Sequence, residues 1–380
     1  MRKNLNLLTA NTILNGKNKW YLIASILFLI GCQPSSNKNP FNPKTSVIPM
    51  PTLLVNKEEF FEAKFLNTKD DFKIREFELF KKQLKNYFPK KTIFSKSTSS
   101  KNFEIKIDEK FEVNNPKDKI IIIYNHGADV NDVKSKDCFW IRELRNWAQL
   151  AGNKINDKEI MVYIHCQGKL EGDLGSKLGK IGMWMKKWEG PYPGTSKMDR
   201  RVEGNLEVVK KFVNLGVPKK QIFMSGHSCG GWATLRLTAK YMNEVGGGIS
   251  LMPACFWNLS KKYKVKKDGY EKAMEKFHKK YPGMAEWRQA QIDIIKEGNA
   301  PILIFTHPMD PYEGLTSDWM DDIPNFKRVV VSEKKKVNGK KCNTAGSNWE
   351  EPLKDLHIIN HADCFMHYHP LIKEYITSRL

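Results

Sequence analysis

The six residues at 226–231, Gly-His-Ser-Cys-Gly-Gly, place Ser228 where it could act as a nucleophile. The apolar run Ile-Phe-Met before them is typical of a buried strand, and the stretch at 232–237 favours a helix. A turn this tight between a strand and a helix strains the backbone at its apex, and side chains two positions away would clash. Glycine at positions 226 and 230 meets that requirement. The following helix would direct its first backbone N–H groups at negative charge that develops beside Ser228.

Two stretches downstream of the serine hold residue types that could activate it. Asp310 follows the apolar run at 301–305 within a few residues, and a histidine-rich segment follows the run at 356–359, which we interpret as the last strand. The chain order of serine, aspartate and histidine, with the serine in a strand-to-helix turn, resembles that of the α/β-hydrolase family. The resemblance covers roughly residues 119–380, outside two insertions.

The resemblance implies a role for each member of a catalytic triad. Ser228 would attack a carbonyl carbon, His361 would take its proton and later protonate the leaving group, and Asp310 would orient the imidazole. The backbone amides of Cys229 and Ala128 would form the oxyanion hole. Ala128 enters this prediction because the His-Gly pair before it follows an apolar run, as in the oxyanion loop of the family.

The choice of histidine and aspartate stays open at this stage. His367 is the alternative base and His369 a further one, because Asp363 occupies the position that some patterns of the family give to the histidine. Three more aspartates could replace Asp310 as the acid: Asp318, Asp321 and Asp322. We expect His126, His227 and His307 to lie near the site without titrating in the reaction. We expect His165 and His278 to be structural or exposed.

The apolar runs and the helical stretches between them alternate along the chain. Further continuous apolar runs, typical of strands buried on both faces, stand at 119–124, 160–164, 221–224, 248–251, 301–305 and 356–359. Helical patterns stand at 71–87, 137–151, 199–215, 231–243 and 269–298, and 103–113 alternates as a half-buried strand does. This alternation predicts an α/β fold with a mostly parallel central sheet and helices on both faces. Together with the resemblance, it indicates an α/β-hydrolase domain over residues 52–380.

Two insertions interrupt the alternation, near 168–197 and 256–299. The second is long, basic and mainly helical, and insertions at strand ends of such sheets often cover a ligand crevice, so we expect a lid or cap. Five aromatic residues in or near the insertions could wall an acyl or aromatic pocket, or could equally pack in the core: Trp184, Trp188, Phe256, Trp257 and Trp319.

The N-terminus predicts export and a lipid anchor. A positively charged stretch without acidic residues precedes a ten-residue apolar run at 21–30, which is too short to span a bilayer. The run ends in Leu-Ile-Gly-Cys, which resembles the bacterial lipobox, so we interpret residues 1–31 as a signal peptide and Cys32 as the lipidated residue. Residues 32–51 would form a flexible tether. The glutamine after Cys32 then implies the outer membrane, with the domain facing the periplasm.

The remaining composition excludes several other classes of protein. The 380 residues are too apolar and aromatic for a disordered chain, and the mean hydropathy of −0.52 excludes several membrane spans. A formal net charge of +21 comes without a nucleic-acid-binding motif, so no nucleic acid partner is expected. Six cysteines besides Cys32 permit disulfides in an oxidising compartment, and Cys138–Cys166 and Cys342–Cys364 are our suggested pairs. Their spacing predicts no metal site, and no cofactor is expected.

These features together predict a serine esterase that cleaves a carboxylic ester through an acyl-enzyme. Its substrate would be an ester-bearing small molecule or an envelope polysaccharide. A peptidase or amidase of the same fold is the second interpretation, since the turn around Ser228 does not distinguish the leaving groups. The third is a non-catalytic lipoprotein whose basic surface binds envelope polymers, because a fold does not by itself determine function.

Overall fold

The structure is a computed structural model that describes residues 92–99, 105–108, 112–127, 146–147, 149–167, 197–256, 259–331, 336–337, 340–341, 356–361 and 363–380. The predicted signal peptide, the tether, the helix at 71–87 and nearly all of the insertion at 168–197 lie outside these residues. Within the described part of the chain, no helix has the length and apolarity that a membrane crossing requires.

A nine-stranded sheet forms the centre of the described residues, in the order β2-β1-β5-β3-β6-β7-β8-β9, with β4 paired to β5. Every pairing from β1 through β9 is parallel, whereas β2 and β4 pair antiparallel with their neighbours. The strands are β1 (Thr92–Ser99), β2 (Ile105–Asp108), β3 (Lys119–Asn125), β4 (Lys154–Ile155), β5 (Lys158–Gln167), β6 (Ile222–His227), β7 (Gly247–Leu251), β8 (Ile302–Thr306) and β9 (Phe326–Val330). A separate hairpin joins β10 (Lys336–Val337) to β11 (Lys340–Lys341).

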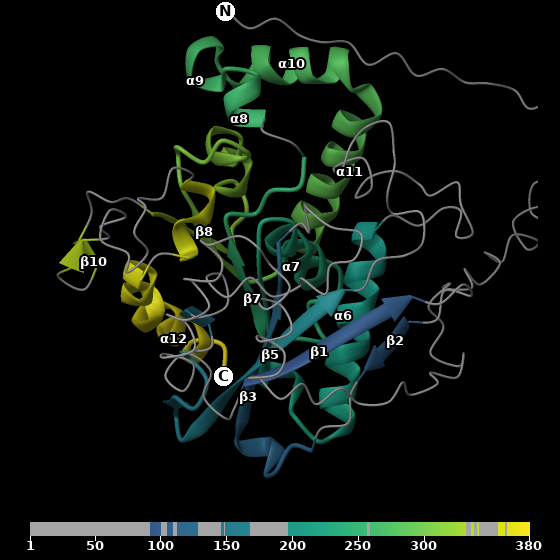
Figure 1. Cartoon of the computed structure of the whole chain (residues 1–380), viewed down its shortest axis with the longest axis vertical. Coiled ribbons are helices and arrows are strands. Elements are labelled where there is room, and N and C mark those ends of the chain that lie inside the picture. The colour runs from purple at the N-terminus through teal and green to yellow at the C-terminus, as the bar shows by residue number, and fades with distance from the viewer. Residues whose placement is uncertain are drawn as a thin grey trace, which may run out of the picture. The chain divides into compact units, whose positions relative to one another are not determined.

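Helices connect these strands, and four of them, α8 to α11, belong to the second insertion. The α-helices are α6 (Lys197–Asn214), α7 (Cys229–Lys240), α8 (Leu259–Lys262), α9 (Val265–Asp268), α10 (Tyr270–Lys280), α11 (Pro282–Gly298) and α12 (His369–Thr377). The 3-10 helices are η1 (Pro116–Asp118), η2 (Lys219–Gln221), η3 (Gly314–Thr316), η4 (Asp318–Met320), η6 (Leu356–His361) and η7 (Asp363–Tyr368). Figure 1 shows α8 to α11, the helical part of the second insertion, grouped together at the top of the view.

The two faces of the sheet are covered by different helices. Successive side chains of a strand point to opposite faces. Ile122 belongs to the buried cluster that includes Ile372 and Ile376 of α12. On β5, Tyr163 packs edge-on against Phe212 of α6, with ring centroids 5.1 Å apart. In Figure 1, α6 and α12 accordingly lie on opposite sides of the strands.

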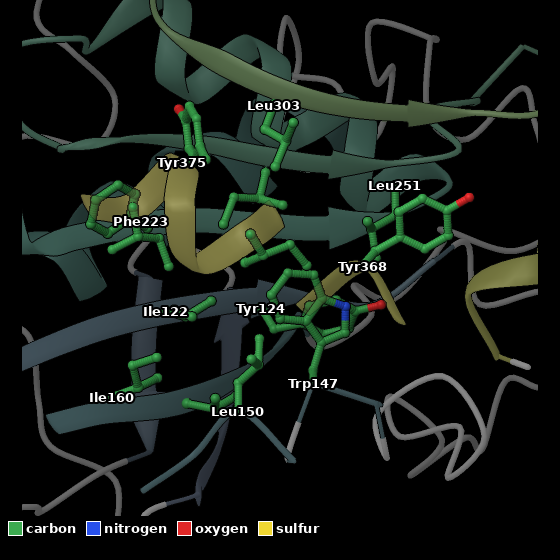
Figure 2. Packing of buried hydrophobic residues seen from close by; sticks show 14 of the residues in the cluster. Ile122, Tyr124, Trp147, Leu150, Ile160, Phe223, Leu251, Leu303, Tyr368 and Tyr375 are labelled. Atoms are coloured by element: carbon green, nitrogen blue, oxygen red, sulfur yellow. The ribbon is translucent and has the colours of Figure 1, made fainter. Parts of the chain in front are cut away.

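The core on the α12 side is continuous across the sheet. Figure 2 shows Phe223 of β6 and Leu303 of β8 beside Tyr375 of α12, and Tyr124 beside Trp147. The Tyr375 hydroxyl donates a hydrogen bond to the Pro301 carbonyl at 2.8 Å, which fastens α12 to the start of β8. The mostly parallel sheet, the helices on both of its faces and the helical insertion fit the α/β-hydrolase fold, which confirms the predicted fold class.

Two predicted elements are wrong. The segment at 356–359 is not a strand but the start of the 3-10 helix η6, and the last strand of the sheet is β9, which the sequence analysis did not identify. The single helix expected at 269–298 is two helices, α10 and α11, because Pro282 cannot continue a helix from within but is well suited to begin one.

Candidate active site

Ser228 lies at the apex of the turn between β6 and α7, in a strained backbone conformation with φ 56° and ψ −123°. The glycines around it are sterically required. A Cβ at Gly226 would lie 2.5 Å from the carbonyl carbon of Gly230, and a Cβ at Gly230 would lie 2.3 Å from the Asn125 carbonyl oxygen. The turn therefore has the close packing that the sequence motif predicts, and it directs the Ser228 side chain away from the sheet.

A chain of hydrogen bonds connects Ser228 to a histidine and an aspartate. His357 Nε2 lies 2.8 Å from Ser228 Oγ, and His357 Nδ1 lies 2.8 Å from Asp310 Oδ2. His357 and Asp310 are both buried. The other carboxylate oxygen of Asp310 accepts a hydrogen bond from the Tyr312 backbone N–H at 2.8 Å. Both oxygens are thus held, and one of them faces the imidazole.

The histidine that lies between Ser228 and Asp310 is His357, and not the predicted His361. The predicted base, His361 with His367 as the alternative, depends on the interpretation of 356–359 as a strand that precedes the base. The segment is η6, and His357 within it makes both contacts. His367 lies in η7, and His369 begins α12, where burial, and then the charge of Lys373, lowers its pKa to about 4.

The imidazole of His357 is held from two further sides. The Tyr312 ring lies with its centroid 4.4 Å from that of His357, and the His227 ring lies at 4.9 Å. His227 Nε2 also donates a hydrogen bond to the His357 carbonyl oxygen at 2.9 Å. His227, the variable residue before the serine in the motif, therefore fixes the backbone of the histidine that contacts Ser228.

The three alternative aspartates have other ion-pair partners or an exposed position. Asp318 and Asp321 both form ion pairs with Arg328, and Asp322 is exposed. Asp310 is the one that lies against His357. It lies four residues after β8, as its position after the apolar run indicates.

The segment after β3 packs directly against the turn that holds Ser228. A Cβ at Gly127 would lie 3.3 Å from that of Ser228. The Arg201 guanidinium of α6 donates to the His126 carbonyl oxygen at 2.6 Å and to His126 Nε2 at 3.1 Å. Since arginine only donates, Nε2 is the acceptor and Nδ1 carries the proton that it shares with the Gly127 carbonyl oxygen. Ala128, the expected second oxyanion donor, lies outside the described residues.

Cys229, whose amide is the other expected oxyanion donor, is the first residue of α7 and forms a disulfide with Cys255. Cys229 is buried, and its bond to Cys255 is not among the pairs that the sequence suggests. The pairs suggested there include Cys138 and Cys342, which lie outside the described residues, so those pairs stay predictions.

The remaining histidines and aromatic residues have mainly structural surroundings. His307 Nδ1 accepts the Met309 backbone N–H at 3.0 Å. Burial, and then the charge of Arg201, lowers the pKa of His165 to about 3, and His278 is exposed. Phe256 is fully buried against Trp232, which favours core packing over a pocket wall. Three of the aromatic candidates lie outside the described residues: Trp184, Trp188 and Trp257. No group of three metal-ligating side chains occurs in the part of the chain that the structure describes.

No family model matches this sequence, and no curated protein is similar enough to match it. Solved structures do match. A naproxen esterase (carboxylesterase NP) from Bacillus subtilis is 14% identical over 81% of this chain and 99% of its own, with a TM-score of 0.38. Est1E from Butyrivibrio proteoclasticus is 14% identical over 70% of this chain and 88% of its own, with a TM-score of 0.35. An acylaminoacyl peptidase from Pyrococcus horikoshii is 13% identical over 71% and 39%, with a TM-score of 0.40.

Proposed function

We propose that this protein is a serine hydrolase that cleaves a carboxylic ester through an acyl-enzyme, with Ser228, His357 and Asp310 as its triad. The observation that carries the proposal is the position of His357. One imidazole lies 2.8 Å from the hydroxyl of a strained serine and 2.8 Å from a buried carboxylate. A structural histidine does not need a serine at the apex of a strained turn on one side and an aspartate on the other.

The proposed reaction starts with proton transfer from Ser228 Oγ to His357 Nε2 as the oxygen attacks the ester carbonyl carbon. Asp310 accepts the hydrogen bond of Nδ1–H, so that the lone pair of Nε2 faces Ser228 and accepts the proton, and it stabilises the imidazolium that forms. The negative charge on the carbonyl oxygen would be stabilised by the Cys229 N–H at the start of α7 and, as the sequence predicts, by that of Ala128.

Collapse of the tetrahedral intermediate would expel an alcohol, which takes the proton from His357. The acyl group is then bonded to Ser228 Oγ. Water then attacks the acyl carbon while His357 accepts one of its protons. Collapse of the second tetrahedral intermediate breaks the bond to Ser228 Oγ, which takes that proton from His357 as the carboxylic acid leaves.

We also propose that the protein acts in the cell envelope, held by a lipid on Cys32 and facing the periplasm. The support is the basic stretch, the short apolar run and the Leu-Ile-Gly-Cys sequence at the N-terminus. An ester-bearing small molecule or an esterified envelope polysaccharide is the substrate class that fits this location.

Steady-state hydrolysis of p-nitrophenyl acetate by the purified protein tests the triad. We expect Ser228→Ala and His357→Ala to abolish turnover above background. Asp310→Asn should lower kcat roughly 10⁴-fold, because an uncharged amide no longer holds the imidazole in the productive tautomer or stabilises its charged form. His361→Ala is the matched control and should keep activity. Full activity in a folded Ser228→Ala variant would contradict the proposal.

A further inference from the structure

The Cys229–Cys255 disulfide joins the residue after the proposed nucleophile to the segment that follows β7. Both cysteines are buried. Cys229 is the first residue of α7, so no carbonyl oxygen within the helix accepts a hydrogen bond from its backbone N–H, and this N–H can donate to a bound oxyanion. Its side chain, by contrast, is fixed to a segment 26 residues away in the sequence.

We propose that Cys255 is a positioning residue for the reaction and that, through this disulfide, it holds the Cys229 N–H where the oxyanion forms. The inference rests on the proposed function, because it needs an oxyanion to be stabilised beside Ser228. It goes beyond that function in making the covalent link between two loops a determinant of turnover.

The strained turn depends on the segment at 251–255 for support. The Ser228 N–H donates to the Leu251 carbonyl oxygen at 3.0 Å, and the Ala254 N–H donates to the Ser228 carbonyl oxygen at 3.2 Å. Ser228 Oγ also lies 3.3 Å from the Ala254 carbonyl oxygen. A strained backbone conformation persists only where surrounding contacts hold it in place. At Ser228 these contacts include two backbone hydrogen bonds and the disulfide, all of them to the segment at 251–255.

That supporting segment is itself held on both sides of the disulfide. Before it, Met252 has φ 42°, and its N–H donates to the Phe305 carbonyl oxygen of β8 at 2.8 Å. After it, Phe256 packs between Trp232 of α7 and Trp287 of α11, with ring centroids 4.8 and 5.2 Å apart. The segment that carries Cys255 therefore links β8, the turn that holds Ser228 and the helical insertion.

Loss of the bond would leave the start of α7 tied to this segment through hydrogen bonds alone. An oxyanion donor contributes most in the transition state, when charge has moved onto the carbonyl oxygen. Displacement of such a donor therefore lowers kcat and leaves KM nearly unchanged. If the disulfide were merely structural, its loss would lower the free energy of unfolding without lowering kcat selectively at a constant KM.

The test measures kcat and KM for p-nitrophenyl acetate in Cys229→Ala, Cys255→Ala and the double variant, with the free energy of unfolding of each. We expect kcat to fall roughly tenfold or more in all three, by similar factors, with KM within about twofold of wild type. The factors should not multiply in the double variant, since each substitution removes the same bond. Phe212→Leu, a core change in α6, is the matched control that lowers stability and should keep kcat.

A second measurement covers the case in which these variants fail to fold. The native protein is reduced with tris(2-carboxyethyl)phosphine, which becomes its oxide with oxygen from water, while the disulfide takes up two electrons and two protons to give two thiols. Alkylation and mass spectrometry identify the thiols, and circular dichroism follows the fold. We expect kcat to fall as Cys229 and Cys255 become alkylatable, and to recover after reoxidation with oxidised glutathione.

Two results would overturn the inference in different ways. The first is a wild-type rate in a folded double variant, or in a reduced protein in which both thiols are identified. That result would show that Cys255 does not position a group for the reaction, and it would not affect the proposed function. A wild-type protein whose hydrolysis rate equals that of Ser228→Ala removes the proposed function and the inference together.

Discussion

Three neighbours determine where the imidazole of His357 lies. Asp310 accepts from Nδ1, the Tyr312 ring packs on one side, and His227 donates to the backbone carbonyl oxygen. The sequence motif names His227 only as the variable residue before the serine, yet the structure gives it a contact with the proposed base. The motif alone therefore does not reveal that the His227 side chain helps to position the proposed base.

We expect His227→Leu to lower kcat roughly five- to tenfold, because one hydrogen bond of about 1 kcal/mol no longer holds the His357 backbone. His227→Gln is the matched variant, since its amide can still donate, and it should lose less. Ester hydrolysis with kcat and KM determined separately makes the comparison. A folded His227→Leu protein with wild-type kcat would show that this contact does not position the base.

Ser228 and Asp310 can be predicted from the sequence but His357 cannot, and the reason is local. Ser228 is marked by glycines that the turn requires, and Asp310 by the apolar strand before it. His357 stands in Leu-His-Ile-Ile, a short run that has the composition of a strand. Its 3-10 conformation and its contact with Ser228, 129 positions away, depend on tertiary packing that no local pattern records.

At the scale of elements, a buried ion pair connects the helical insertion to the segment that carries Asp310. Arg288 of α11 donates to both carboxylate oxygens of Glu313, at 3.1 and 2.8 Å, and to the Thr316 carbonyl oxygen at 3.1 Å. Both side chains are almost fully buried, at 4% and 2% exposed. The insertion is thereby fixed to the loop between β8 and β9 and is not a freely hinged cover at this point.

We expect Arg288→Met to lower the free energy of unfolding by about 3–5 kcal/mol, because Glu313 is left buried without its counter-charge. Arg288→Met combined with Glu313→Leu should recover much of that loss, since no buried charge remains. Urea unfolding of the single and double variants measures both values. Equal destabilisation of the two would mean that packing, and not the uncompensated charge, sets the effect.

The elements that the sequence predicted well are those buried on both faces of the sheet. The runs at 119–124, 160–164, 248–251 and 301–305 became β3, β5, β7 and β8 because continuous apolar sequence has no other favourable place in such a fold. β9 was missed because Phe-Lys-Arg-Val-Val, at the end of the strand order, carries charged residues. The Cys229–Cys255 pair was missed because six cysteines allow 15 pairings and the sequence does not rank them.

For the whole molecule, two histidines held neutral in the fold imply a defined response to acid. The pKa of His165 falls to about 3 because it is buried and lies near Arg201, and that of His369 falls to about 4. In the unfolded chain both would titrate near 6.5, so the unfolded state binds more protons at lower pH. Stability is complete above about pH 6.5 and declines as the pH falls towards the folded values.

We expect His165 alone to account for about 2 kcal/mol of the stability lost between pH 7 and pH 5. His165→Phe keeps a ring beside Tyr163 and removes the titration, so its loss over this interval should be smaller by that amount. Urea unfolding of both proteins at the two pH values gives the difference. The same pH dependence in both would contradict a neutral His165 in the fold.

The central claim is that Ser228 is a nucleophile activated by His357. The most direct measurement is the rate of labelling by a fluorophosphonate, with the adduct located by mass spectrometry, in wild type, Ser228→Ala, His357→Ala and His361→Ala. We predict an adduct on Ser228 that forms at the wild-type rate in His361→Ala, forms far more slowly in His357→Ala and is absent from Ser228→Ala. No adduct on folded wild type, or labelling that depends on His361 and not on His357, would contradict the account.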